Sequence, residues 1–264
     1  MNKAASASRQ PALFLGHGSP MNAIEDNQWS RAFRALGERL PRPRAILSIS
    51  AHWFVSGTHV TANAYPKTIH DFGGFPRELY DVQYPAPGDP DLARRVVDLL
   101  GSSASLADDW GLDHGTWSVL LHLFPQADIP VVQLSLDYRL PPAEHLALAR
   151  KLLPLREEGI LILGSGNIVH NLRYAFTAYT RGDLSTPPWA TEFDAIAAAA
   201  MQARDGEALV WAVATEKGRM AHPTLDHYLP ILYVLGCVDP GDELTFPVEG
   251  FDMGSLSMRA GMYL

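Results

Sequence analysis

The sequence predicts a single α/β domain in which a mixed, mostly parallel central sheet carries helices on both faces. Short apolar runs alternate with amphipathic segments along the chain, which is typical of a layered α/β sheet. The 264 residues are 47% hydrophobic, enough to bury one large core. Residues 11–264 show no linker, fixed-period repeat or low-complexity tract, whereas the polar residues 1–10 are expected to form a disordered tail.

The first elements predict a βαβ unit. Ala12–Leu15 is a short apolar run that ends at a glycine, as a buried strand does. Residues 26–40 carry apolar side chains at helical spacing and stop before two prolines, so we expect a helix there. Ala45–Trp53 is apolar and β-branched in its first half and predicts a second strand. Strands joined in this way are parallel, and the crossover between them is right-handed.

The middle of the chain continues the alternation. Residues 70–90, rich in glycine, proline and aromatic side chains, predict an ordered loop. A buried strand is expected where Gly159–Leu172 begins, before it runs into a Gly-Ser-Gly turn. The other elements expected in this part are helices over 89–100, 113–124 and 142–153 and a strand over 129–136.

The last third predicts two helices and two strands. Glu192–Arg204 is an alanine-rich helix. Residues 222–238 are expected to form a mostly apolar helix that Thr224 caps and Pro230 kinks. Residues 243–251 and 255–264 are expected to be antiparallel neighbours, which would make the sheet mixed.

Composition excludes several classes of function. A formal net charge of -8 argues against nucleic acid or an anionic membrane surface as a partner. The single cysteine, Cys237, rules out a disulfide within the chain and a cysteine-based zinc site. The N-terminus lacks the apolar stretch of a secretory signal, and no run is as long as a membrane span, so we expect a cytoplasmic protein. The oligomeric state stays open.

Four histidines are placed to meet at one edge of the sheet. His17 follows the first strand, His52 ends the second, and His170 follows the strand within 159–172. Open α/β sheets bind ligands outside the carboxyl ends of their strands. His227 would lie in the first turn of a helix capped by Thr224, where the helix dipole keeps the imidazole neutral. A lone histidine is more often a polar loop residue, but the shared topology of His17 and His52 favours a site for one divalent iron or zinc ion.

The other histidines are assigned different roles. His222 competes with His227 as a ligand, and we expect it instead to orient the loop or contact the substrate. His114, in the segment "DHG", is expected to serve the site, and His70 to line the pocket. The histidines expected to be structural or inert are His59, His122 and His145.

Several long segments resemble a known family. They are "LFLGHGSPMNAIEDN", "SAHW", "HDFGGFP", "DHG", "PVVQLSLD", "SGNIVHNL" and "HYLPILYVLG" with a later "GSLSM". Together they resemble the LigB-type, or class III, extradiol ring-cleavage dioxygenases, the group that includes the 4,5-DOPA extradiol dioxygenases. The resemblance runs from about Pro11 to the C-terminal "GSLSM" segment, nearly the whole chain.

The resemblance implies a fold, an activity and a set of residues. The fold would be an α/β sandwich around a mixed sheet. The enzyme would insert both atoms of O₂ beside the diol of a catechol such as DOPA, giving a muconic semialdehyde-type product. The implied metal ligands are His17, His52, His170 and His227, with His170 also discussed as the acid–base residue and His114 facing the oxygen or substrate pocket. One Fe(II) ion per chain is expected, and zinc is described as the bound ion in some members.

The sequence departs from the usual iron pattern. Non-haem iron oxygenases commonly use two histidines and one carboxylate, and no carboxylate ligand can be identified in this chain. Asp226 neighbours His227, but adjacent side chains diverge on a helix. A set of neutral histidines suits zinc as readily as iron, yet zinc has no redox chemistry for activating O₂.

The remaining predictions concern the substrate and the alternatives. His222, Trp53, Phe72 and Phe75 are expected to contact the aromatic substrate, although the loop aromatics could equally form a satellite hydrophobic cluster. One alternative function is a zinc-dependent hydrolase, which would need a carboxylate base and no oxygen. The other is a non-catalytic LigB-like protein that binds a ligand or peptide, which would need a basic anion pocket.

Overall fold

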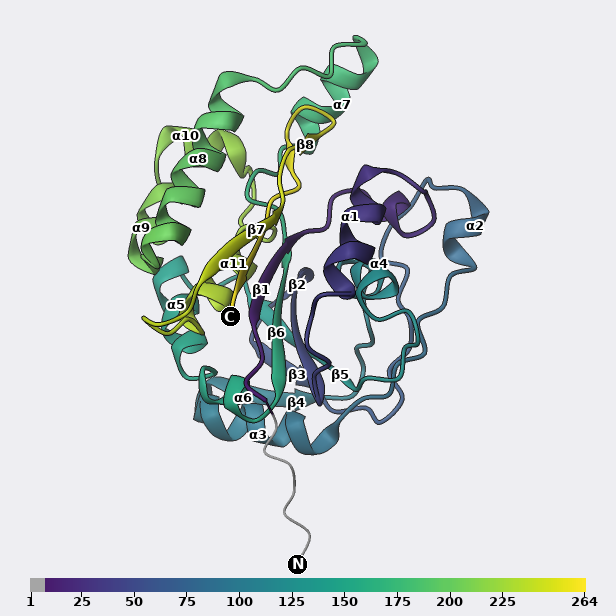
Figure 1. The fold of residues 1–264 in the computed structure, drawn as a ribbon, viewed down its shortest axis with the longest axis vertical. Coiled ribbons are helices and arrows are strands. Elements are labelled where there is room, and N and C mark those ends of the chain that lie inside the picture. Colours follow the sequence, from purple (N-terminus) through teal and green to yellow (C-terminus); the bar gives the residue numbers. More distant parts are fainter. Residues whose placement is uncertain (1–7) are drawn as a thin grey trace, which may run out of the picture.

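An eight-stranded mixed sheet lies between two layers of helices in the computed structural model, which describes residues 8–264 (Figure 1). The order of the strands is β4-β3-β5-β2-β6-β1-β10-β7, and β8 and β9 form a separate two-stranded sheet. The strands are β1 (Ala12–Gly16), β2 (Ala45–Val55), β3 (Thr58–Thr61), β4 (Ala104–Ala107), β5 (Val131–Asp137), β6 (Ile160–Gly166), β7 (Leu244–Val248), β8 (Phe251–Asp252), β9 (Leu256–Ser257) and β10 (Ala260–Tyr263).

The parallel centre of the sheet positions the later site. β6 lies between β1 and β2 and pairs with both in parallel, and β2 also pairs in parallel with β5. These strands are almost fully buried, as expected for a parallel sheet that is covered on both faces. Because parallel strands share a direction, the segments that follow β1, β2 and β6 meet at one edge of the sheet.

Helices cover both faces of the sheet (Figure 1). One layer, with α1 and α4, packs on a core that includes Phe33 and Trp117; the other, with α5, α8, α9 and α11, packs on a core that includes Phe193 and Tyr233. The helices are α1 (Gln28–Gly37), α2 (Arg77–Tyr80), α3 (Pro90–Leu100), α4 (His114–Leu123), α5 (Pro142–Arg150), α6 (Pro154–Glu157), α7 (Leu172–Thr180), α8 (Pro188–Ala203), α9 (Gly206–Val213), α10 (Glu216–Ala221) and α11 (Leu229–Gly236), with 3-10 turns η1 (Pro20–Ala23) and η2 (Gly101–Ser103).

The predicted fold class is confirmed, including the antiparallel pair at the C-terminus, where β7 pairs with β10. The prediction of a helix over 222–238 was wrong about the residue at which the helix begins. Residues 223–228 form bends and turns, α11 begins only at Leu229, and Thr224 is not its cap. Pro230 lies in the first turn of α11, where its missing N–H costs no hydrogen bond, so it does not kink the helix.

Two further observations bear on the predicted boundaries. Within residues 8–264, no helix is both long and apolar enough to cross a membrane. Of the predicted tail, residues 1–7 lie outside the described residues, while Arg9 forms ion pairs with Glu157, Asp239 and Asp242.

Arg156 is a fully buried cation that ties both ends of the domain together. It donates to the carbonyl oxygens of Gln10, Cys237 and Tyr263 and pairs with the buried carboxylate of Asp242. Replacing Asp242 by alanine leaves this charge without its partner, and we expect the free energy of unfolding to fall by about 3–5 kcal/mol.

Urea unfolding followed by circular dichroism measures this loss. Asp26→Ala is the matched control, because Asp26 pairs with Arg31 and Arg34 at the surface and should cost about 1 kcal/mol or less. Equal losses in the two variants would contradict the role given to the buried pair.

Candidate metal centre and active site

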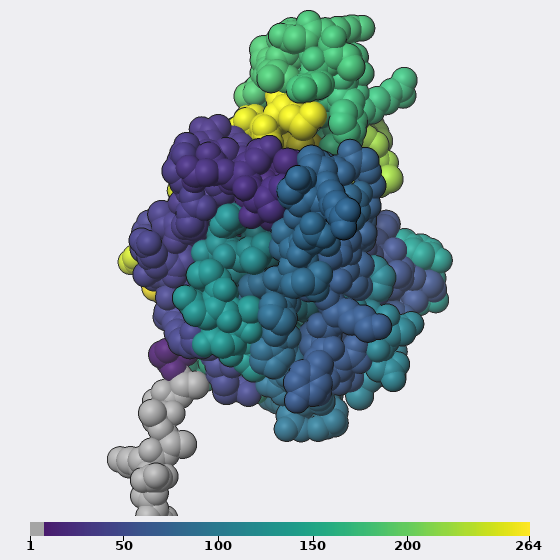
Figure 2. All heavy atoms as spheres, turned by 90° about the vertical axis from the view of Figure 1, so that its right-hand side faces the viewer, coloured from purple at the N-terminus to yellow at the C-terminus, as the bar shows by residue number. Residues whose placement is uncertain are grey.

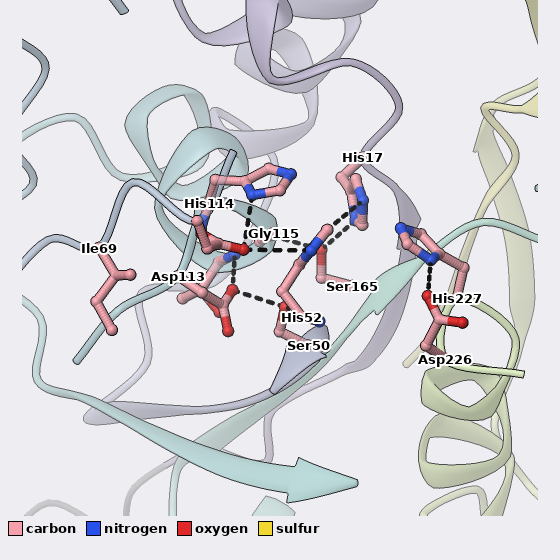
Figure 3. A network of polar contacts seen from close by, with 12 residues as sticks. His17, Ser50, His52, Ile69, Asp113, His114, Gly115, Ser165, Asp226 and His227 are labelled. Carbon is pink, nitrogen blue, oxygen red and sulfur yellow. Dashed lines mark hydrogen bonds and ion pairs between the residues drawn. The ribbon is translucent and has the colours of Figure 1, made fainter. Parts of the chain in front are cut away.

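Three imidazole rings form a nearly equilateral triangle at the carboxyl edge of the sheet. His17 directly follows β1, His52 lies near the end of β2, and His227 lies in the turn before α11. Their ring centroids are separated by 5.1 Å (His17–His52), 5.2 Å (His17–His227) and 5.0 Å (His52–His227), and Figure 3 shows the three rings turned toward one another. Imidazoles bound to one tetrahedral ion at about 2.0–2.1 Å have centroids about 5 Å apart, so the triangle has the size of a metal site.

For His17 and His52 the nitrogen atoms agree with this geometry. Nε2 of His17 and Nε2 of His52 are 3.3 Å apart, about the separation of two ligands on one tetrahedral ion. Nδ1 of His17 contacts Oγ of Ser165 at 2.9 Å, and Nδ1 of His227 contacts Oδ2 of Asp226 at 2.5 Å. An oxygen at Nδ1 fixes the ring orientation and leaves Nε2 to bind the ion, as oxygen partners commonly do for metal-binding histidines.

His227 reaches the triangle through a close approach of two backbones. The carbonyl oxygen of His227 accepts the N–H of Asn167, just after β6. A Cβ atom on Gly166 would lie 2.2 Å from that carbonyl oxygen, so only glycine allows the contact. The prediction of a turn at "GSG" was wrong, because Gly164–Gly166 form the end of β6, where the small residues let the 222–228 segment lie against the strand.

His114 and His170 lie outside the triangle. His114 is the first residue of α4, and one ligand atom from each of His17, His52 and His114 lies within 4.8 Å of the others. However, the centroid of His114 is only 3.7 Å from that of His52 and 5.9 Å from that of His17. The ring of His170 is stacked on His227 with centroids 3.4 Å apart, and within residues 8–264 its nitrogens have no hydrogen-bond partner.

Burial keeps the rings of His17, His52, His170 and His227 neutral. Both side chains of His52 and His170 are half-buried, and loss of water around them lowers the pKa of His52 to about 3 and of His170 to about 4. Burial, followed by the neighbouring imidazoles, lowers the pKa of His17 and His227 well below the usual value. Neutral imidazole is the form that binds a metal, so the cluster is ready to accept a cation near neutral pH.

The family follows from sequence comparison. Residues 11–250 match the family described as the catalytic LigB subunit of aromatic ring-opening dioxygenase. The chain belongs to the LigB family. It is 53% identical to a 4,5-DOPA dioxygenase extradiol of Escherichia coli (strain K12), over 96% of this chain and 94% of that protein. It is also 36% identical to a 4,5-DOPA dioxygenase extradiol of Beta vulgaris, over 93% of each chain.

A solved structure has the same fold. The crystal structure of an uncharacterized protein from Escherichia coli K12 superposes with a TM-score of 0.83 and 47% sequence identity, covering 96% of this chain and 99% of that one. The resemblance stated from the sequence motifs is therefore confirmed. This LigB-family chain is an extradiol ring-cleaving dioxygenase, an enzyme that uses a small aromatic molecule and O₂.

The aromatic loop between β3 and α2 borders the histidine cluster. Phe72 meets the ring of His114 edge-on at 5.3 Å, and Phe75 packs edge-on against Phe72 at 5.4 Å. Figure 2 shows this loop and the segment after β1 side by side on one face of the molecule, with α7 and the residues after it projecting above them. Both phenylalanines are only half-buried, so an aromatic substrate could pack against them.

Two predicted substrate contacts, Trp53 and His222, are buried in the structure. Trp53 is buried and stacks on Trp110 with centroids 5.5 Å apart. Neighbouring residues of a strand point to opposite faces of the sheet, and His52 points to the face that carries the site. His222 is buried against Phe193, and its Nε2 contacts the carbonyl oxygen of Ile168 at 2.7 Å. This contact agrees with the loop-orienting role, and contact of His222 with the substrate stays a prediction.

Sequence reasoning missed the oxygen atoms that hold the rings, which come from Asp71, Ser165 and Asp226. Asp226 was considered only as a ligand and rejected for its place on a helix, yet residues 226–228 form a turn and its carboxylate contacts Nδ1 of His227. Asp71 stands in the quoted "HDFGGFP" segment, and its carboxylate contacts both His52 and His114. The signal for this role in the sequence was the position of Asp71, an acidic residue next to a glycine-rich aromatic segment.

The neutral histidines make the stability of the metal-free protein depend on pH. Their pKa values are lower in the folded than in the unfolded state, so protons bind preferentially to the unfolded chain as pH falls below 6.5. We expect the free energy of unfolding to decrease by a few kcal/mol between about pH 6.5 and about pH 4, and to recover at higher pH.

Thermal melts of the metal-free protein across this range test the expectation. The variant His52→Gln should show a weaker decrease, because one buried imidazole is gone. A melting temperature that is flat over the range would contradict the assignment of neutral, buried rings.

Proposed function

We propose that this chain is an Fe(II)-dependent dioxygenase that opens the ring of a catechol such as DOPA to a muconic semialdehyde-type product. The single observation that carries the proposal is the triangle of His17, His52 and His227, whose Nε2 atoms are left free for one ion. The names of the relatives support the extradiol reaction and suggest DOPA. Family membership favours this function over the zinc hydrolase and the non-catalytic binding protein.

We assign the metal to His17, His52 and His227 and leave His170 outside the ligand set. Three neutral nitrogen donors leave coordination positions for substrate and O₂ and suit either Fe(II) or zinc. When bound, Fe(II) supplies the one-electron chemistry that O₂ requires and that zinc lacks. The overall reaction needs no external reductant, because the ring supplies the electrons and both oxygen atoms stay in the product.

The residues around the triangle supply proton transfer. The free nitrogens of His170 can accept a proton from a catechol hydroxyl and return it later in the reaction. Nδ1 of His114 is held at 2.9 Å from Oδ2 of Asp71, so its Nε2 is the atom that can exchange a proton with the substrate or with oxygen. Phe72, edge-on to His114, would hold the aromatic ring and exclude water on that side.

Anaerobic reconstitution tests the proposal. The purified protein is loaded with Fe(II) or with zinc, mixed with DOPA and a panel of other catechols, and exposed to air-saturated buffer. We expect the Fe(II) form to consume one O₂ per catechol and to give a yellow product, and the zinc form to consume none.

His59→Gln is the matched control. His59 contacts Ser56 and Ser105 away from the site, so this variant should keep the wild-type activity. Absence of oxygen uptake with every catechol would overturn the proposed substrate class, and oxygen-independent ester or amide hydrolysis by the zinc form would favour the hydrolase.

A further inference from the structure

We propose that Asp71 is a positioning residue that holds a metal ligand and a proton-transferring residue with the same carboxylate. Its partners are His52 and His114. The inference rests on the proposed function and assigns Asp71 two separable effects, one on metal affinity and one on turnover.

The contacts of Asp71 are shared between the two histidines. Oδ2 of Asp71 lies 3.2 Å from Nδ1 of His52 and 2.9 Å from Nδ1 of His114. Oδ1 accepts the backbone N–H of His114 at 2.8 Å. Since a carboxylate only accepts hydrogen bonds, the ring of His114 carries its proton on Nδ1 and presents a bare Nε2. The same oxygen faces Nδ1 of His52 at ion-pair distance. One oxygen atom therefore sets the tautomer of His114 and lies beside Nδ1 of His52, and the centroids of these two rings are 3.7 Å apart.

The loop that carries Asp71 is anchored to the start of α4. Ile69 donates its N–H to the carbonyl oxygen of Leu112 at 2.7 Å, and Leu112 donates to that of Lys67 at 2.8 Å. The indole N–H of Trp117 donates to the carbonyl oxygen of Ile69 at 2.8 Å. These bonds fix the backbone beside Asp71, so the carboxylate is positioned before any substrate arrives.

An amide cannot replace this carboxylate. Asparagine at position 71 has one acceptor oxygen and one donor NH₂ group. If the oxygen faces the two rings, the NH₂ group opposes the backbone N–H of His114. If the amide is flipped, the NH₂ group opposes the Nδ1–H of His114 and replaces the negative oxygen beside Nδ1 of His52. Asp71→Asn therefore disturbs His52 and His114 together, whereas Asp71→Glu keeps two acceptor oxygens on a longer side chain.

Two comparison variants separate the effects. Asp226 contacts Nδ1 of His227 alone among the histidines, so Asp226→Asn should act through the metal. His114→Gln removes the proton-transferring ring and leaves the three proposed ligands, so it should act on turnover. Asp71→Asn should combine both effects.

The experiment measures Co(II) affinity and the visible Co(II) spectrum in the absence of substrate, and then kcat and KM for DOPA at saturating Fe(II). For Asp71→Asn we expect the Co(II) affinity to fall about 10–100-fold with an altered spectrum, and kcat to fall about 100-fold or more with a smaller change in KM. Asp71→Glu should recover part of both. For His114→Gln only kcat should fall, with the spectrum unchanged.

Each contrary result is distinct. Wild-type Co(II) affinity and spectrum in Asp71→Asn would overturn the inference even if catechol cleavage is confirmed. Normal kcat in Asp71→Asn at saturating Fe(II) would reduce Asp71 to a metal-site residue and overturn the shared role. A loss of Co(II) affinity in His114→Gln as large as in His52→Gln would make His114 a ligand and overturn the inference as well.

If the wild type binds Co(II) but cleaves no catechol, the proposed function fails while the effect on affinity is still measured. If Asp71→Asn fails to fold, the same readouts on Asp71→Glu, with thermal stability as a check, decide the matter, and wild-type values for both would overturn the inference.

Discussion

Replacing His227 by glutamine should lower the affinity for Fe(II) or zinc by about 100- to 1,000-fold. Metal binding to a complete four-ligand site contributes roughly 10–16 kcal/mol, so one ligand accounts for about 3 kcal/mol. The loss should be as large as for His17→Gln or His52→Gln, because the centroids of the three rings are separated by nearly equal distances. Competition titrations with a chromophoric chelator measure the three affinities side by side.

The variant His114→Gln is the decisive comparison for this prediction. A ligand atom of His114 lies within 4.8 Å of those of His17 and His52, so it forms the alternative third corner. We expect His114→Gln to retain nearly the wild-type affinity. Tight binding in His227→Gln together with loss in His114→Gln would contradict the ligand set.

Replacing His170 by glutamine should lower kcat by about 100- to 10,000-fold while the metal stays bound. General acid–base catalysis contributes rate enhancements of this size, and the ring nitrogens of His170 are free of protein partners within the described part of the chain. Stopped-flow absorbance at saturating Fe(II), with metal content measured on the same sample, tests both halves of the expectation.

Two outcomes would change the role of His170. If His170→Gln loses its metal, the ligand role implied by the family resemblance is restored. If kcat stays at the wild-type value, proton transfer belongs to His114 alone, and the stacking of His170 on His227 serves to support a ligand.

The sequence predicted the sheet and the convergence of histidines because both depend on connectivity. A strand–helix–strand unit fixes the direction of β1 and β2, so His17 and His52 had to reach the same edge. The strand β4 was missed among the named elements because it has four residues and lies at the edge of the sheet, where little apolar pattern is needed.

The rest of the site depends on tertiary contacts that no local pattern encodes. His227 was placed at the site for the wrong reason, since burial among other rings, and not the dipole of a helix, keeps it neutral. Asp71, which faces Nδ1 of His52, lies 19 residues from it in the sequence, and Ser165, which contacts Nδ1 of His17, lies 148 residues away. Trp53 was expected at the site because it follows His52 directly in the sequence. Neighbouring residues of a strand point to opposite faces of the sheet, so Trp53 stacks on Trp110 on the other face.

Crystals of the protein soaked anaerobically in Fe(II), with anomalous diffraction at the iron edge, test the central claim most directly. The triangle predicts one iron peak per chain, about 2.0–2.2 Å from Nε2 of His17, His52 and His227, with His114 and His170 beyond bonding distance. An iron peak bonded to Nε2 of His114 in place of His227, or no peak at the three rings, would contradict it.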